Sequence, residues 1–121
     1  MRALRRLFEE HQIRLPRITV TDRQLALINA LNIRFPESKC LLCRWHFNKC
    51  VLAKARTTIH KQVKGKDDKG NETFFDHADT LNFMHRFYHC IDADEVDDLG
   101  REWGSLMTDY PCMREYFDKN W

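Results

Sequence analysis

The residues best suited to chemistry are a carboxylate and a Cys-x-x-His motif, each at the end of a short apolar or β-branched run. Asp22 follows Arg17–Thr21, and the run Lys39–Cys43 leads through Cys43 to His46. A carboxylate at the end of a strand is held by a rigid element and still faces solvent, where a metal ion and a phosphate can reach it. The pattern therefore suits a divalent cation that binds a phosphate group.

Two strands and two helices must position these residues. Helical spacing of apolar side chains predicts an amphipathic helix over residues 2–11. The β-branched run Arg17–Thr21 predicts a buried strand, and Lys39–Cys43 predicts a second one. A helix between them, ended by Pro36, makes a helix–strand–helix–strand series with short connections. Such a series predicts a parallel strand pair with helices packed on it.

The start of the second helix is predicted by a capping box. Thr21 and Gln24 stand three residues apart, as the Ser/Thr and Glu/Gln of that motif do. The helix is therefore predicted to open at Asp22 or Arg23. A carboxylate in the first turn also complements the helix dipole, which is an ordinary structural explanation for Asp22.

After His46 the pattern becomes helical throughout. Apolar residues that recur every four positions predict a long helix to about Val63, followed by a polar turn or flexible loop over residues 65–71. Three further helices are predicted, over residues 76–90, 93–108 and 112–121. Nothing after Cys43 resembles a strand, so the second part of the chain is predicted to be all-helical.

The charges are segregated along the chain. Residues 1–69 carry 16 Lys and Arg against 6 Asp and Glu, whereas residues 70–121 carry 4 against 12. The first half, at about +10, is suited to contact a polyanion. The alternative is that the two oppositely charged halves attract each other.

Composition narrows the class of protein. The 121 residues suffice for one domain or part of one, and 12% aromatic residues favour a packed structure. No run approaches the ~18 apolar residues of a membrane span, and no signal peptide is visible. Five cysteines, an odd number without regular spacing, do not form a disulfide framework and indicate a reducing compartment.

Several segments together resemble a known family. They are Thr21-Asp22-Arg23-Gln24 with the residues up to Ala30, Phe35-Pro36, Cys43-Arg44-Trp45-His46 with its flanks from 41 to 49, and, more loosely, the Trp103…Tyr110-Pro111…Trp121 pattern. They resemble the transposases of Mutator-like elements (the MULE transposase domain), most closely the group found in fungal genomes. The resemblance covers almost the whole chain and is densest over residues 16–54.

The resemblance implies an Asp-Asp-Glu active site. Asp22 matches the second catalytic aspartate, and Cys43 and His46 match the Cys-x-x-His motif of the family. The first aspartate would lie on a strand before Met1 and the glutamate on a helix after Trp121. We therefore expect the chain to be a truncated or degenerate copy that is inactive alone, and leave open whether it is an enzyme.

The implied fold is of the α/β (α+β) class. Residues 1–46 would form part of a ribonuclease-H-like core, and residues 47–121 would form a helical insertion region. In the intact family enzyme, Mg²⁺ or Mn²⁺ would support DNA cleavage and strand transfer. The implied partners are transposon ends and target DNA, a homo-oligomer is possible in the intact enzyme, no membrane is involved, and the implied location is the nucleus or otherwise the cytoplasm.

A basic stretch is a candidate for phosphate contact. Its members follow the Cys-x-x-His motif within a short part of the chain: Lys49, Lys54, Arg56, Lys61 and Lys64. Lysines and arginines on one helix face can neutralise DNA phosphates. The ordinary alternative is a solvated helix face.

Zinc is a competing interpretation of the cysteines. Cys40, Cys43 and His46 offer Cys-x-x-Cys with a nearby histidine. Residues an odd number apart on a strand point to opposite faces, and no fourth ligand has finger-like spacing, so zinc is not favoured. Two alternatives to a transposase fragment remain: a non-catalytic DNA-binding or regulatory protein derived from a transposase, and a small zinc-stabilised interaction module.

Overall fold

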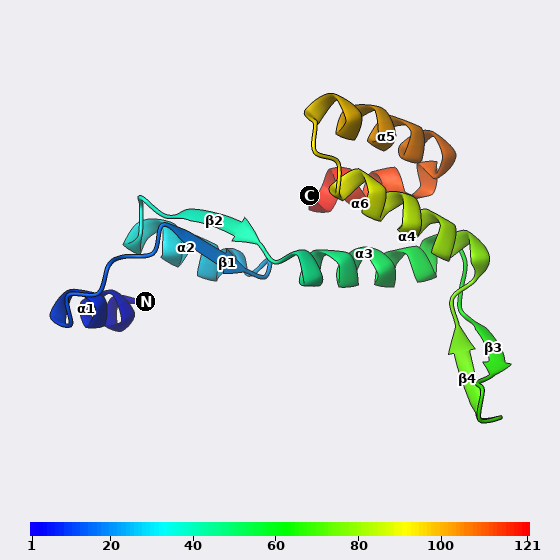
Figure 1. The fold of residues 1–121 in the computed structure, drawn as a ribbon, viewed down its shortest axis with the longest axis horizontal. Coiled ribbons are helices and arrows are strands. Elements are labelled where there is room, and N and C mark those ends of the chain that lie inside the picture. Colours follow the sequence, from blue (N-terminus) through cyan, green and yellow to red (C-terminus); the bar gives the residue numbers. More distant parts are fainter. The chain divides into compact units, whose positions relative to one another are not determined.

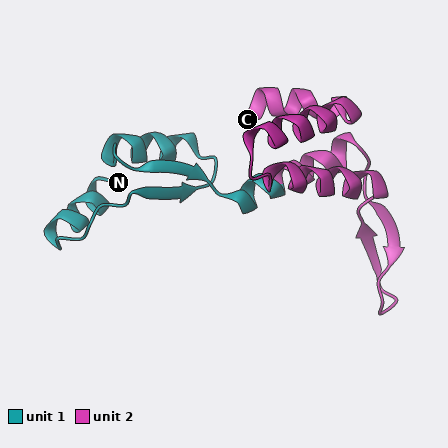
Figure 2. Cartoon of the chain, turned by 45° about the horizontal axis from the view of Figure 1, so that its top comes forward, with its two compact units in different colours: residues 1–49 teal, residues 50–121 magenta.

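The structure divides into two compact units. The computed structural model describes all residues, 1–121, and its units are Met1–Lys49 and Cys50–Trp121 (Figure 2). The elements of the first unit are α1 (Arg2–Glu10), β1 (Ile18–Thr21), α2 (Leu25–Arg34) and β2 (Lys39–Leu42) (Figure 1). The helix α3 (Arg44–Thr58) begins in the first unit and ends in the second.

The predicted parallel strand pair is confirmed. β1 and β2 run parallel, with Ile18 opposite Lys39 and Thr21 opposite Leu42. The series α1–β1–α2–β2 and the mixed α+β class also agree with the prediction. The helix α2 connects the two strands and packs on β2. Because the strands are parallel, their carboxyl ends lie at the same edge of the sheet.

The core of the first unit is small and lies on one face of the sheet. Leu31 and Phe35 are buried, and the Phe8 ring meets Phe35 edge-on with 6.2 Å between ring centroids. On the other face, Ile18 and Val20 are 58% and 63% exposed. Alternate residues of a strand point to opposite faces, so one face is covered and the other is open.

The predicted start of α2 is wrong by two to three residues. The helix begins at Leu25, after Gln24, and no side chain caps it. Thr21 is the last residue of β1, and its hydroxyl donates to the backbone carbonyl of Asp22 at 2.9 Å. Thr21 belongs to β1, and the predicted capping box does not form.

The second unit is mainly helical. Its helices after α3 are α4 (Ala78–Ile91), α5 (Val96–Asp109) and α6 (Pro111–Asn120), each close to a predicted helix. Pro111 opens α6, where a missing backbone N–H is tolerated. The helices enclose a core of large apolar residues: Val51, Ala55, Phe83, Met84, Phe87, Cys90, Leu106, Met107, Met113 and Phe117.

The prediction that the second part is all-helical is wrong. α3 ends at Thr58, not near Val63, and an antiparallel hairpin follows: β3 (Val63–Lys66) and β4 (Glu72–Phe75). The segment predicted as a polar turn or flexible loop, residues 65–71, contains the turn of this hairpin. The carboxylate of Asp67 accepts the N–H groups of Lys69 and Asn71 at 2.9 and 2.8 Å.

A glycine completes the turn of the hairpin. Gly70 has φ 81°, a left-handed conformation that glycine adopts without a steric penalty. The prediction took Val63 as the end of a helical apolar face, whereas Val63 is the first residue of β3 and pairs with Phe75. None of the helices combines the length and apolarity that crossing a membrane requires.

Candidate functional site

Asp22 lies at the carboxyl end of β1. It is half-buried and directly follows Thr21, which is 7% exposed. Its Oδ1 accepts the backbone N–H of Gln24 at 3.3 Å and lies 3.4 Å from the Thr21 hydroxyl. Both contacts use one carboxylate oxygen, so the carboxylate is oriented by its neighbours through Oδ1 while neither contact engages Oδ2.

Cys43 lies beside Asp22 at the same edge of the sheet. The backbone N–H of Cys43 donates to the carbonyl of Thr21 at 2.7 Å, which extends the parallel ladder past the last strand residues. The Cys43 carbonyl then accepts the N–H of Phe47 at 3.0 Å, the first hydrogen bond of α3. The ends of two neighbouring strands therefore bring Asp22 and the start of the Cys-x-x-His motif together.

The Cys-x-x-His motif stands at the start of α3. Hydrogen bonding from the backbone and the side chain of His46 lowers the pKa of Cys43 below its ordinary value. The Trp45 ring meets His46 edge-on, with 4.7 Å between centroids. Cys43 is half-buried.

We predict that His46→Ala raises the pKa of Cys43 toward its ordinary value. The native hydrogen bonds favour the thiolate, so they stabilise the fold above the ordinary thiol pKa, and this contribution is lost as the pH falls through the lowered pKa of Cys43. Alkylation followed by mass spectrometry at a series of pH values measures this shift. In the native protein Cys43 should react faster than Cys90, whose thiol pKa is raised by burial and by Glu102.

The control for this prediction is His85→Ala, which removes an exposed histidine from α4. It should leave the alkylation profile of Cys43 unchanged. An identical Cys43 profile in the native protein and in His46→Ala would contradict the contribution of the His46 side chain to the lowered pKa of Cys43.

No set of metal ligands converges in the structure. No three His, Cys, Asp or Glu side chains come together in a way that could hold an ion. His85 and His89 contact each other edge-on, with 5.0 Å between centroids, and no third ligand joins them. Asp22 is therefore a single carboxylate, which can supply one ligand to a cation that takes its others from elsewhere.

The five predicted phosphate contacts lie on different elements. Lys49 and Lys54 lie on α3, whereas Lys64 lies on β3. The Lys49 ammonium lies 4.9 Å from the centroid of the Trp45 ring. Arg56 binds both carboxylate oxygens of Asp76, at 2.6 and 2.9 Å.

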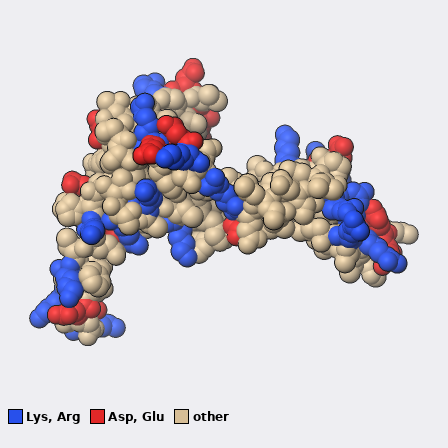
Figure 3. All heavy atoms as spheres, turned by 180° about the vertical axis from the view of Figure 1, so that it is seen from behind, with Lys and Arg blue, Asp and Glu red and all other residues tan.

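Two of these five residues, Arg56 and Lys61, differ in what surrounds them. The Arg56–Asp76 pair raises the pKa of Arg56, and Arg56 holds the pKa of Asp76 below its ordinary value. This geometry makes Arg56 a structural residue. Lys61 is exposed in the segment before β3. Lysines and arginines are distributed over the surface in several places (Figure 3).

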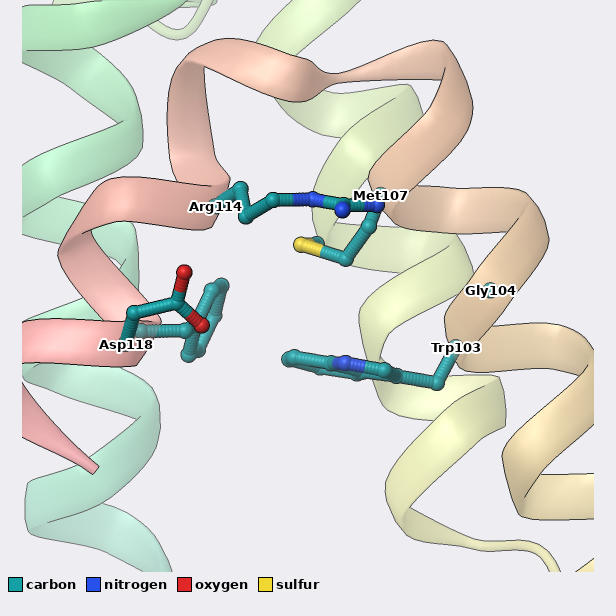
Figure 4. Close-up of a pocket in the computed structure, with 6 residues that line it drawn as sticks. Trp103, Gly104, Met107, Arg114 and Asp118 are labelled. Atoms are coloured by element: carbon teal, nitrogen blue, oxygen red, sulfur yellow. The ribbon is translucent and has the colours of Figure 1, made fainter.

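A pocket between α5 and α6 was not predicted. It has a volume of about 280 Å³, and Trp103 and Met107 reach into it from α5 toward Arg114 and Asp118 on α6 (Figure 4). The Trp103 ring packs edge-on against Phe117, with 4.7 Å between centroids. The only sequence signal for it is the i, i+4 spacing on each helix, which is equally typical of ordinary helix packing.

Comparison with known proteins agrees with the geometry of the first unit. A family model, the MULE transposase domain, matches residues 1–50. This match indicates a transposase-derived protein. The matched segment, residues 1–50, is similar to part of that domain. No curated protein and no solved structure matches the chain.

Proposed function

We propose that this chain is part of a Mutator-like DNA transposase of the Asp-Asp-Glu type, and that its first unit is part of a ribonuclease-H-like core. The observation that carries the proposal is the place of Asp22, at the carboxyl end of a parallel strand pair within the matched residues 1–50. A rigid strand end holds a carboxylate at a defined position, as metal-assisted phosphoryl transfer requires.

The role of Asp22 in this proposal is to supply one carboxylate to Mg²⁺ or Mn²⁺. The donor set fits, because hard cations prefer carboxylate oxygens and Asp22 keeps one oxygen outside its two local contacts. A bound cation would neutralise charge on the phosphodiester. Two further acids of the triad would come from outside residues 1–121, so we expect this polypeptide alone not to cut DNA.

The Cys-x-x-His motif has a positioning role in the proposal. The carbonyl of Cys43 accepts the first hydrogen bond of α3 immediately after β2, and the N–H of Cys43 binds the carbonyl of Thr21, next to Asp22. The motif would thereby hold the strand end that carries the acid. Lys49 and Lys54, on the helix that follows the motif, would contact DNA phosphates. The protein would act in the nucleus, on element ends and target DNA.

Paramagnetic line broadening by Mn²⁺ tests the role of Asp22 without requiring activity. In amide NMR spectra of the 121-residue chain, we predict that millimolar-range Mn²⁺ broadens Thr21, Asp22 and Cys43 first, since one carboxylate binds such a cation weakly. Asp22→Asn should remove this broadening. The control, Asp97→Asn, removes an exposed carboxylate near the start of α5 and should leave it unchanged.

Two outcomes would contradict the metal assignment. One is broadening centred on the acidic residues 92–98 with none at the ends of β1 and β2. The other is broadening at those strand ends that persists in Asp22→Asn. Either result would favour the non-catalytic DNA-binding or regulatory interpretation.

A further inference from the structure

The hairpin β3–β4 presents a mixed basic and aromatic face. Lys64 lies opposite Phe74 and Lys66 lies opposite Glu72, and residues directly opposite each other share a face of a strand pair. We call these four residues the Lys64–Phe74 face. Phe74 is 59% exposed, and the Lys64 ammonium lies 6.0 Å from the centroid of its ring. The hairpin extends away from the helices of its unit (Figure 1).

On the opposite face of the hairpin, the partly exposed Phe75 packs across the neighbouring strand. The Phe75 ring lies across Gly65, so closely that a Cβ at Gly65 would be 2.8 Å from two ring carbons. Phe75 therefore covers the backbone of the neighbouring strand and stiffens the ribbon. Phe74, the next residue, points to the other face and has no comparable intramolecular role.

Side-chain contacts connect both ends of the hairpin to the neighbouring helices. Arg56, on α3, forms its two hydrogen bonds with Asp76, which directly follows β4. His60 precedes β3 and stacks on His77 at the start of α4, with 3.6 Å between ring centroids. The Thr80 hydroxyl donates to the His60 carbonyl at 3.2 Å. The exposed Phe74 ring therefore lies on a hairpin whose ends are connected to α3 and α4.

The chemistry of the Lys64–Phe74 face suits an unpaired nucleotide. An exposed aromatic ring offers a stacking surface to any base, and an adjacent lysine offers a charge to the phosphate. No acid lies opposite Lys64, whereas Glu72 partly offsets Lys66. The lysine beside an aromatic ring also distinguishes this face from a purely apolar protein-docking surface, because a polyanion complements its charge.

We propose that the Lys64–Phe74 face binds single-stranded DNA, with Phe74 stacked on an unpaired base and Lys64 on the neighbouring phosphate. This site is separate from Asp22. The proposal rests on the proposed function in one respect: that function is the reason for choosing DNA over RNA as the polymer. Strand cleavage and transfer leave unpaired nucleotides near the reacting ends, and a held aromatic ring would retain one of them.

Fluorescence anisotropy with a short labelled oligodeoxythymidine and the full 121-residue chain tests this site. Phe74→Ala should weaken binding of the oligonucleotide roughly ten- to a hundredfold, because the variant loses base stacking. Phe74→Trp should retain binding, because the indole ring also stacks on a base. Lys64→Ala should lower the slope of log affinity against log salt by about 0.7, the value for one phosphate contact on a single strand. The matched control is Leu81→Ala, which removes a side chain on α4 that is 53% exposed.

Three results would overturn the proposal: equal affinity of Phe74→Ala and the native chain, equal affinity of Phe74→Ala and Phe74→Trp, or tighter binding of oligouridine than of oligodeoxythymidine. Circular dichroism of each variant verifies folding, and Phe74 is exposed enough that its truncation should leave the spectrum unchanged. The Mn²⁺ experiment at Asp22 is read at another site, so its failure and a failure here are distinguishable.

Discussion

Phe87→Ala is expected to destabilise the second unit by about 3–5 kcal/mol. Phe87 is fully buried on α4, with ring centroids 6.2 Å from Phe83 and 6.0 Å from Phe117. Its truncation would remove a large apolar surface from the contact between helices and leave a cavity that rigid neighbours cannot fill. Since small domains have total stabilities of about 5–15 kcal/mol, the loss is a large fraction of the whole.

Urea denaturation followed by circular dichroism measures this loss. The matched control is Leu81→Ala on the same helix, where a 53% exposed side chain should change the free energy of unfolding by no more than about 0.5 kcal/mol. Amide exchange in β1 and β2 should be the same in Phe87→Ala as in the native chain, because these strands belong to the other unit. A change below about 1 kcal/mol for Phe87→Ala would contradict the assignment of this core.

The helices and the parallel strand pair were predictable because each has a strong local signal. The β-branched run before Asp22 and the apolar run before Cys43 predict strands, and a helix of suitable length between them makes the pair parallel. Proline at position 111 and the periodic apolar residues predict the later helices.

The hairpin was missed because its signals compete with a helical one. The four-residue recurrence that runs from Val51 to Ile59 continues to Val63 and suggests one long helix. Contacts distant in sequence decide otherwise: Phe75 packs on Gly65, and Arg56 binds Asp76. A local pattern contains neither contact, so periodicity alone overextends the helix.

The candidate site was predictable in position but not in detail. The place of Asp22 at a strand end follows from where the β-branched run stops. The effect of His46 on the pKa of Cys43 depends on the first turn of α3 and was not predicted. The basic stretch was predicted from charge alone, and that signal cannot show that Arg56 is engaged with Asp76.

A nicking assay with Mg²⁺ tests the catalytic role of Asp22 most directly. The protein to assay is a longer chain that also carries the strand and the helix expected to supply the other two acids. We predict that Asp22→Asn lowers the nicking rate by at least about a hundredfold, since it removes a direct metal ligand, and that Asp97→Asn leaves the rate unchanged. Equal rates for the native chain and Asp22→Asn would show that Asp22 is not catalytic.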